Sequence, residues 1–318
     1  MPYPVCYGRK SLAIVKSTMQ TQAQKRRRSG PRIAWLPVLC LAPATALLAV
    51  VFIYPIFSTL LDSVSHVSAL AGRTHVGTTE NWRAITADPV FMRGVLPRTI
   101  AWTLSVVTLT LALSLPAALL LHAPFRGRKL ARAAMLLPWA VPLPIAAIVW
   151  RFILDGQIGT LNALLAKVGI QGPVWLAQAG TAFPMVVWVG VWASIPFTVV
   201  TLLAGLQGIG SDVIEAGALD GAVGWSRFRF ITLPLLRPVL NVAVVLNTVY
   251  VFNSFPIIWV LTQGGPAGST DTLITYLYKT AFRFSMPGPA QAMGVVSFCV
   301  LLVFSLVYLR VTEGSRQT

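Results

Sequence analysis

Long apolar runs, separated by shorter polar segments, organise this chain. A helix needs about 20 apolar residues to cross the hydrocarbon layer of a membrane. Six runs reach span length: Ala34–Phe57, Thr99–Leu121, Ala133–Leu154, Phe183–Leu206, Pro238–Leu261 and Ala290–Leu309. Barrel strands would be shorter and would alternate in polarity along their length. The pattern therefore predicts an all-α membrane protein with six transmembrane helices.

Composition agrees, and the placement of charge predicts an orientation. The chain is 56% hydrophobic and 11% charged, whereas soluble domains carry about 25% charged residues. Lys and Arg number 17 in the two terminal segments and the second and fourth loops, against 7 in the other loops, with Arg151 inside the third span. The positive-inside rule then puts both termini in the cytoplasm.

The net charge of +16 also raises nucleic acid as a partner. The basic tract Lys25–Arg28 lies just before the first span, where such tracts anchor topology and attract anionic lipid. We therefore expect membrane lipid and no nucleic acid as a partner of this tract.

No catalytic constellation or metal site is apparent. The sequence lacks a P-loop and an HExxH motif, and Cys6, Cys40 and Cys299 have no metal-ligand spacing. None of the nine acidic residues lies mid-span, whereas proton-coupled carriers usually need intramembrane carboxylates or histidines. We expect no catalytic residues, no metal and no cofactor in this chain, and an energy supply from a partner.

The fourth loop, residues 207–238, has the pattern of a short amphipathic helix followed by a turn. Asp212 and Glu215 have the spacing of a capping box. Ala216, Leu219 and Val223 follow as one apolar stripe, and Asp220, Gly221 and Gly224 favour a tight exit. Phe228, Ile231 and Leu235 form a second apolar face, before Pro234 and Pro238, which are expected to limit further helix.

This loop resembles the EAA loop of permease subunits in binding-protein-dependent ABC importers. The pattern is carried by Glu215, Ala216, Asp220, Gly221, Ala222, Phe228, Ile231, Leu233, Pro234 and Pro238, while Gly217 stands where Ala is usual. The resemblance implies that the loop is a coupling helix that docks in a groove of a cytoplasmic ATPase. The implied ATPase-coupling residues are Glu215, Ala216, Gly217, Asp220, Gly221, Ala222, Phe228 and Pro234.

Other segments resemble the carbohydrate-uptake (maltose and trehalose) branch of the same family. They are Glu80–Trp82, Asp88–Phe91, Leu137–Trp139, Trp150–Arg151, Gly159–Asn162, Leu261–Pro266, Ser269–Thr270 and Tyr276–Tyr278. Arg98-Thr99 departs from the branch, in which Asn-Thr is common at this place. The resemblance covers residues 34–310 and implies import of a mono- or disaccharide.

The resemblance also implies an architecture and a set of partners. The fold is that of a type I ABC importer transmembrane domain, with residues 1–33 a basic, disordered cytoplasmic tail, 34–311 the permease domain and 312–318 a second cytoplasmic tail. The implied partners are a second permease, two ATPase subunits that hold ATP and Mg²⁺, and an external solute-binding protein or lipoprotein. The implied location is the bacterial inner membrane.

Asn247, Tyr250 and Ser254 in the fifth run share one helical face and are candidates to line the solute pathway. The alternative is that their polar groups hydrogen-bond between helices. Pro116, Pro142, Pro144, Pro196 and Pro256 break helix hydrogen bonds in or near spans and are candidate flexible points.

Two other functions remain open. One is the same architecture importing glycerol phosphate, a polyamine or another small polar solute. The other is a stand-alone secondary carrier or a membrane scaffold, which the coupling-loop pattern and the lack of intramembrane acids disfavour.

Overall fold

The computed structural model describes residues 35–68 and 72–314, so the tail 1–33 and the tract Lys25–Arg28 lie outside it. The chain divides into two compact units, residues 1–57 and 58–318. In the first unit, α2 (Trp35–Leu48) and the π-helical turn η1 (Ala49–Ile53) lead into α3 (Tyr54–Ser63). The side chains described in α2 and η1 are mostly apolar and exposed, as Leu39 and Val50 show. A helix that is apolar all round suits lipid.

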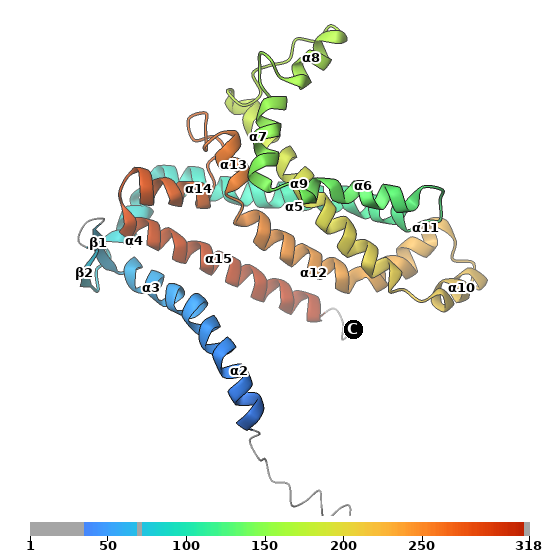
Figure 1. Cartoon of the computed structure of the whole chain (residues 1–318), viewed down its shortest axis with the longest axis horizontal. Helices are drawn as coiled ribbons and strands as arrows, with labels where there is room; N and C mark the ends of the chain where they lie inside the picture. The colour runs from blue at the N-terminus through green and yellow to red at the C-terminus, as the bar shows by residue number, and fades with distance from the viewer. Residues whose placement is uncertain (1–34, 69–71, 315–318) are drawn as a thin grey trace, which may run out of the picture. The chain divides into compact units, whose positions relative to one another are not determined.

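The second unit is mainly helical (Figure 1). After the end of α3 it contains β1 (Ser65–Ser68), β2 (Gly72–Val76), α4 (Glu80–Ala87), η2 (Phe91–Val95), α5 (Leu96–His122), α6 (Arg128–Ala140), α7 (Leu143–Ile153), α8 (Thr160–Lys167), α9 (Ala179–Gln207), α10 (Ser211–Leu219), α11 (Gly224–Arg227), η3 (Phe228–Thr232), α12 (Leu233–Phe252), α13 (Pro256–Leu261), α14 (Leu273–Tyr278), η4 (Lys279–Arg283) and α15 (Pro287–Gly314). The antiparallel hairpin β1–β2 is an addition that the apolar runs did not predict.

The predicted helical membrane fold is confirmed. Within the described residues, five helices are long and apolar enough to cross a membrane, and a bent pair makes up to six. The third predicted span, Ala133–Leu154, is not one straight helix, because α6 and α7 meet at an angle of 94°. Val141 and Pro142 are extended there and Pro144 follows in the first turn of α7. Proline cannot donate the backbone hydrogen bond that a continuous helix would need.

Three of the π-helical turns end two residues before a proline. The N–H groups of Tyr54, Leu96 and Leu233 each donate to the carbonyl five residues earlier, and Pro55, Pro97 and Pro234 follow them. The wider turn lets the helix continue through the following proline, which has no N–H to donate to the helical hydrogen-bond pattern. The helix therefore continues from Gly224 through Phe252, and the expectation that Pro234 and Pro238 would limit it is wrong.

Trp102 joins three of the long helices in the core. Its indole Nε1 donates a 2.9 Å hydrogen bond from α5 to the carbonyl of Val251 at the end of α12. The rim of the same ring lies on Gly190 of α9, where a Cβ atom would overlap it. Hydroxyl groups on α5 and α9, such as those of Thr103 and Thr198, donate to carbonyls one turn back. These two buried hydroxyls are thus satisfied inside their own helices, which suits a lipid environment.

The long helices of the second unit alternate in direction, which sorts its loops onto two ends (Figure 1). The end of α5, the α9–α10 loop and the end of α15 lie at one end, which we call the α10 end. The hairpin, α4 and α14 lie at the other, which we call the hairpin end. The loop between α5 and α6, the fourth loop and the C-terminal end of α15 thus lie at the same end of the helices. That this end faces the cytoplasm stays a prediction.

Candidate functional site: a projecting loop and a polar cluster

The EAA-like loop forms a helix–turn–helix that projects at the α10 end (Figure 1). Of the eight candidate coupling residues, Glu215, Ala216 and Gly217 lie on α10, while Asp220, Gly221 and Ala222 form the turn that closes it. Phe228 and Pro234 lie on the continuous helix that follows. The structure thus brings six of the eight residues into one compact element.

The predicted capping box at the start of α10 is wrong. The N-cap is Gly210, whose side chain offers no oxygen, and no side-chain cap is formed. Because α10 begins at Ser211, Asp212 falls in its first turn and accepts a 3.1 Å hydrogen bond from the Ser211 hydroxyl. An acid in the first turn still interacts favourably with the positive end of the helix. Glu215 lies beyond that turn with its side chain exposed.

A Schellman motif ends α10. The N–H of Ala222 donates to the carbonyl of Gly217 at 2.8 Å, and the N–H of Gly221 donates to that of Ala218 at 3.1 Å. Gly221 has φ +82°, the left-handed conformation that this motif requires and that glycine adopts without steric cost. The prediction of a tight, glycine-dependent exit is confirmed, and the turn fixes the direction in which the chain leaves the helix.

Gly217 is the point at which α10 rests on the next helix. It is buried, and a Cβ atom built on it would overlap Cδ1 of Ile231 in η3. The glycine that departs from the family pattern therefore makes room for a bulky neighbour. This contact was not predicted, because the residues are 14 positions apart and belong to different helices.

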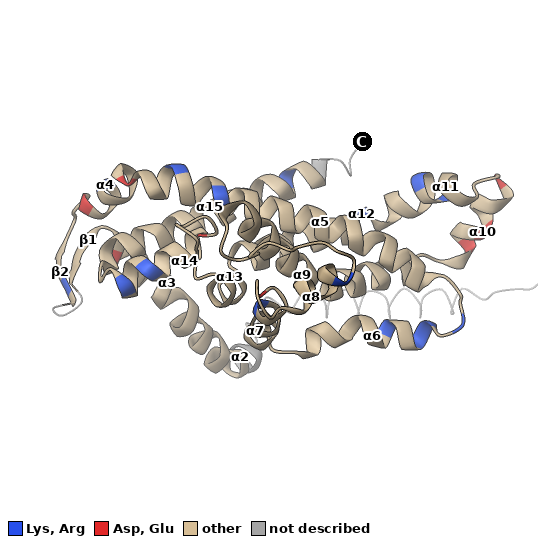
Figure 2. Ribbon diagram, turned by 90° about the horizontal axis from the view of Figure 1, so that it is seen from above, with Lys and Arg blue, Asp and Glu red and all other residues tan. Residues whose placement is uncertain are grey.

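The outer face of this loop combines exposed apolar and acidic side chains. Leu219 is 91% exposed, and Val223, Trp225 and Phe230 are also well exposed. Asp212, Glu215 and Asp220 are exposed as well, and Figure 2 shows acidic residues on α10 with basic ones on α11. The residues of the expected stripe, Ala216, Leu219 and Val223, are all exposed in the described part of the chain. Exposed apolar clusters of this kind mark protein or membrane interaction sites.

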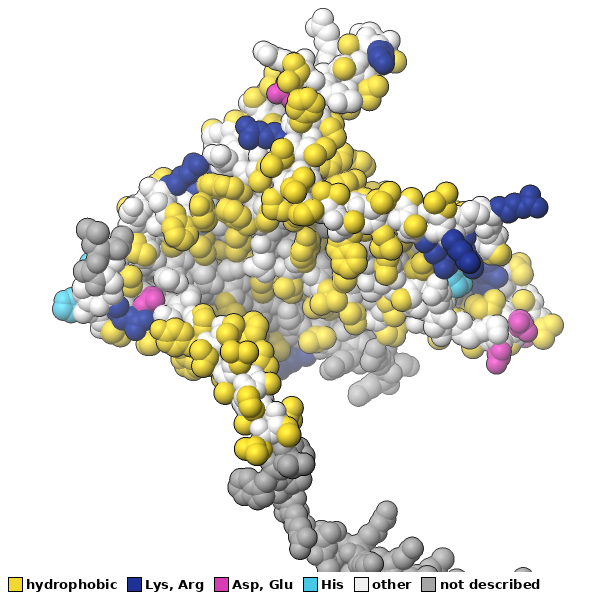
Figure 3. All heavy atoms as spheres, in the orientation of Figure 1, with side chains coloured by type: hydrophobic (Ala, Val, Ile, Leu, Met, Phe, Trp, Pro, Cys, Tyr) yellow, Lys and Arg dark blue, Asp and Glu magenta, His cyan; other side chains and the backbone are white. Residues whose placement is uncertain are grey.

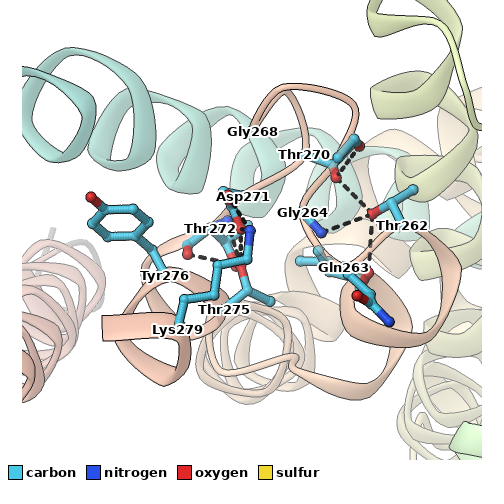
Figure 4. Close-up of polar contacts among 12 residues, drawn as sticks. Thr262, Gln263, Gly264, Gly268, Thr270, Asp271, Thr272, Thr275, Tyr276 and Lys279 are labelled. Carbon is cyan, nitrogen blue, oxygen red and sulfur yellow. Dashed lines mark hydrogen bonds and ion pairs between the residues drawn. The ribbon is translucent and has the colours of Figure 1, made fainter. Parts of the chain in front are cut away.

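A second organised region lies at the hairpin end, in the loop between α13 and α14 (Figure 4). Lys279 Nζ lies 2.7 Å and 2.9 Å from the two carboxylate oxygens of Asp271, and both side chains are largely buried. The Thr275 hydroxyl donates to the same carboxylate at 3.1 Å. Arg98 of α5 donates to the carbonyls of Gly268 and Asp271. We call Arg98, Gly268, Asp271, Thr275 and Lys279 the Asp271 cluster.

The Asp271 cluster holds the Gly264-Gly265-Pro266 segment in place. Gly264 has φ +84°, and a Cβ atom there would overlap the carboxylate of Asp271. Arg98, which departs from the carbohydrate-branch pattern, is one of the residues that clamp this loop to α5. The glycines of this segment are apparent from the sequence, whereas the pair Asp271–Lys279 was not predicted. The signal available was an acid and a base eight residues apart in an otherwise apolar region.

Further contacts join this region to the rest of the hairpin end. The Tyr276 hydroxyl donates a 2.7 Å hydrogen bond to Asp88. Burial, and then that hydrogen bond, raise the pKa of the Tyr276 hydroxyl, which therefore remains a donor at neutral pH. Arg283 lies over the Trp259 ring, 4.8 Å from its centre, and donates to Gln263. Two of the segments that resemble the carbohydrate branch, Asp88–Phe91 and Tyr276–Tyr278, are thus in contact.

The three candidate pathway residues have different environments. Asn247 is buried and its Nδ2 donates to the Thr198 hydroxyl of α9 at 2.8 Å, which is an interhelical hydrogen bond of the alternative kind. Tyr250 is 52% exposed. Ser254 lies beyond the end of α12, and its hydroxyl is buried without a hydrogen-bond partner among the described residues. A role for these residues in the pathway stays a prediction.

No group of three or more potential metal ligands occurs among the residues that the structure describes.

Residues 98–316 match the family of the "Binding-protein-dependent transport system inner membrane component". Relatives include a probable ABC transporter permease protein of Brucella suis, 45% identical over 285 residues, covering 89% of this chain and 98% of the relative. The trehalose/maltose transport system permease protein MalF of Thermococcus litoralis is 36% identical, covering 90% and 96%. The sn-glycerol-3-phosphate transport system permease protein UgpA of Yersinia pestis is 30% identical, covering 90% and 97%.

A solved structure has the same fold. It is the crystal structure of a bacterial alginate ABC transporter in complex with an alginate pentasaccharide-bound periplasmic protein. The match has a TM-score of 0.74 at 21% identity and covers 86% of this chain and 92% of that one.

The chain belongs to the inner membrane components of binding-protein-dependent transport systems. It is a transmembrane ABC transporter permease of the sugar and glycerol-phosphate type, with the fold of a type I importer permease.

Proposed function

We propose that this chain forms half of the translocation pathway of an importer for a mono- or disaccharide and couples to a cytoplasmic ATPase through the α10–α11 loop. The observation that carries the proposal is the shape and chemistry of that loop. A Schellman turn fixes its exit, and its outer face presents exposed Leu219 and Trp225 beside exposed acids. Exposed apolar residues mark protein or membrane interaction sites, and the acids beside them favour a protein partner over the bilayer surface.

The partners follow from this role. Two ATPase subunits would supply ATP and Mg²⁺, a second permease would complete the pathway, and an external solute-binding protein or lipoprotein would deliver solute. This chain would then need no ATPase site, metal or cofactor of its own. The bacterial inner membrane, with the α10 end and both termini in the cytoplasm, is the proposed location.

Site-directed cross-linking tests the docking. In a variant without native cysteines, Leu219→Cys should cross-link to the ATPase subunit in membranes that contain the assembled importer. Leu130→Cys is the matched control, because Leu130 is 76% exposed at the same end but lies on α6. Cross-linking at position 130 with none at position 219 would refute the proposed docking face.

Glycerol phosphate is the second candidate solute. The relative named for sn-glycerol-3-phosphate aligns over 90% of this chain, and the relative named for trehalose and maltose aligns over the same share at higher identity. Uptake of radiolabelled disaccharide and of radiolabelled glycerol phosphate by vesicles with the assembled importer and its binding protein would separate the two. We expect saturable uptake of the disaccharide, and uptake of glycerol phosphate alone would contradict the sugar proposal.

A further inference from the structure

A cavity of about 770 Å³ lies at the α10 end, between the projecting loop and the ends of the long helices. Its volume falls within the range of small-molecule pockets, about 300–1,000 Å³. The wall is mainly apolar, with Leu115, Leu119, Leu206, Ile209, Ile214 and Phe228 among its residues. Two residues of the loop proposed to dock the ATPase, Trp225 and Phe228, also line this cavity, whereas Leu219 and the acidic residues of α10 do not.

The rim of this cavity is basic. Arg227 and His122 line it and none of its lining residues is acidic. Arg128 and Arg132 lie close enough to repel a charge on His122, and Figure 3 shows Lys and Arg gathered beside a histidine at this end. Arg128 and Arg132 donate to carbonyls at the end of α5. Within the described part of the chain, Arg227 has no ion pair, so its guanidinium is available to an added anion.

The position of the rim matches the headgroup layer of a bilayer. The helical stretch Phe91–His122 has 32 residues and spans about 48 Å at 1.5 Å per residue. The hydrocarbon core is only about 30 Å thick, so this helix extends beyond it. The basic residues Arg126, Arg128 and Lys129 that follow His122 favour the headgroup layer for this end. An apolar cavity under a cationic rim at that depth complements a molecule with an apolar tail and an anionic head.

We propose that the cavity binds one anionic phospholipid, with an acyl chain against the apolar wall and the phosphate between Arg227 and His122. Arginine suits the phosphate because its planar guanidinium can donate two parallel hydrogen bonds. The bound lipid would fill the space beneath the projecting loop and so support the position of α11. The inference needs only the membrane location of the chain and does not rest on the proposed sugar or on ATPase docking.

Native mass spectrometry of the detergent-purified importer tests this proposal. After delipidation, the protein is titrated with palmitoyl-oleoyl phosphatidylglycerol or with phosphatidylcholine that has the same acyl chains. We expect one tightly retained phosphatidylglycerol and no equivalent phosphatidylcholine. Arg227→Gln should weaken retention about fivefold, the effect of one surface charge on an anionic headgroup. Arg126→Gln is the matched control, because Arg126 is exposed at the same end and does not line the cavity.

A second variant tests the tail. Ala123→Phe fills the lining without changing charge and should also reduce retention of phosphatidylglycerol. Equal retention of the two lipids, or equal weakening by Arg227→Gln and Arg126→Gln, would overturn the proposal. Displacement of the lipid by inorganic phosphate at equal concentration would reduce the site to a simple anion site. Loss of the lipid whenever the ATPase subunit is bound would show that the ATPase occupies the cavity instead. Displacement by phosphate and loss on ATPase binding would each refute the lipid site.

Discussion

The Cδ1 atom of Ile231 occupies the space in which a side chain at position 217 would have to stand. This contact links α10 to the π-helical turn that precedes Pro234. Position 217, where the family pattern usually has alanine, is a glycine here, and its missing side chain leaves room for Ile231. The projecting loop is therefore held both by its own turn and by a close contact with the next helix.

Gly217→Ala should destabilise the loop, and Ile231→Val should suppress that effect. Overpacking costs about 1–3 kcal/mol, whereas replacing a helical glycine by alanine gains up to about 1 kcal/mol. A small net loss follows for the single variant, and a gain follows once Cδ1 is removed. Melting temperatures of the purified importer carrying each single variant and the pair would show it, and additive effects would contradict the contact.

The buried pair Asp271–Lys279 should tolerate loss of both charges far better than loss of one. Lys279→Met leaves a buried carboxylate without its partner, which costs about 3–5 kcal/mol. Adding Asp271→Asn should recover most of the lost thermal stability. Arg283→Gln, which removes an exposed cation from the same turn, should change stability by less than about 1 kcal/mol. A double variant no more stable than Lys279→Met would contradict the pairing.

Tyr250 and Asn247 should respond differently to truncation. Tyr250→Ala removes an exposed ring and should lower solute uptake while leaving assembly and basal ATP hydrolysis intact. Asn247→Ala breaks the hydrogen bond to Thr198, which should cost about 0.6 kcal/mol of stability, the average for such bonds in membranes. Leu246→Ala is the exposed control on α12. Unchanged solute uptake by the Tyr250 variant would contradict a role of this helical face in the pathway and would favour a purely structural role.

Much of the architecture could be predicted from hydrophobicity, because lipid demands long apolar helices and leaves few alternatives. The effect of a proline on its helix was harder to predict. The helix does break at Pro142 and Pro144, as expected, but at Pro234 it continues, because a π-helical turn precedes the proline. The Gly221 turn was predictable since its chemistry is local. The contacts Gly217–Ile231 and Arg98–Gly268 join separate elements of the chain, and no single-sequence pattern encodes them.

Both termini should face the cytoplasm, because Lys and Arg concentrate on that side of the predicted topology. In a variant without native cysteines, an impermeant thiol reagent added to intact spheroplasts should label His75→Cys on the exposed hairpin strand. Ser315→Cys should react only after permeabilisation. Labelling of position 315 alone in intact spheroplasts would reverse the orientation.

The central claim is that the α10–α11 loop couples this permease to an ATPase. The most direct measurement is ATPase co-purification and solute-stimulated hydrolysis for two variants, Gly221→Arg and Glu215→Lys. Gly221→Arg forces a side chain into a left-handed turn, at about 1–2 kcal/mol, and Glu215→Lys reverses an exposed charge. Gly221→Asn is the control, because asparagine tolerates this conformation. The account predicts that both variants keep the partner permease but lose the ATPase or its stimulation, while Gly221→Asn retains both. Full ATPase content with normal stimulated turnover in Gly221→Arg and Glu215→Lys would contradict it.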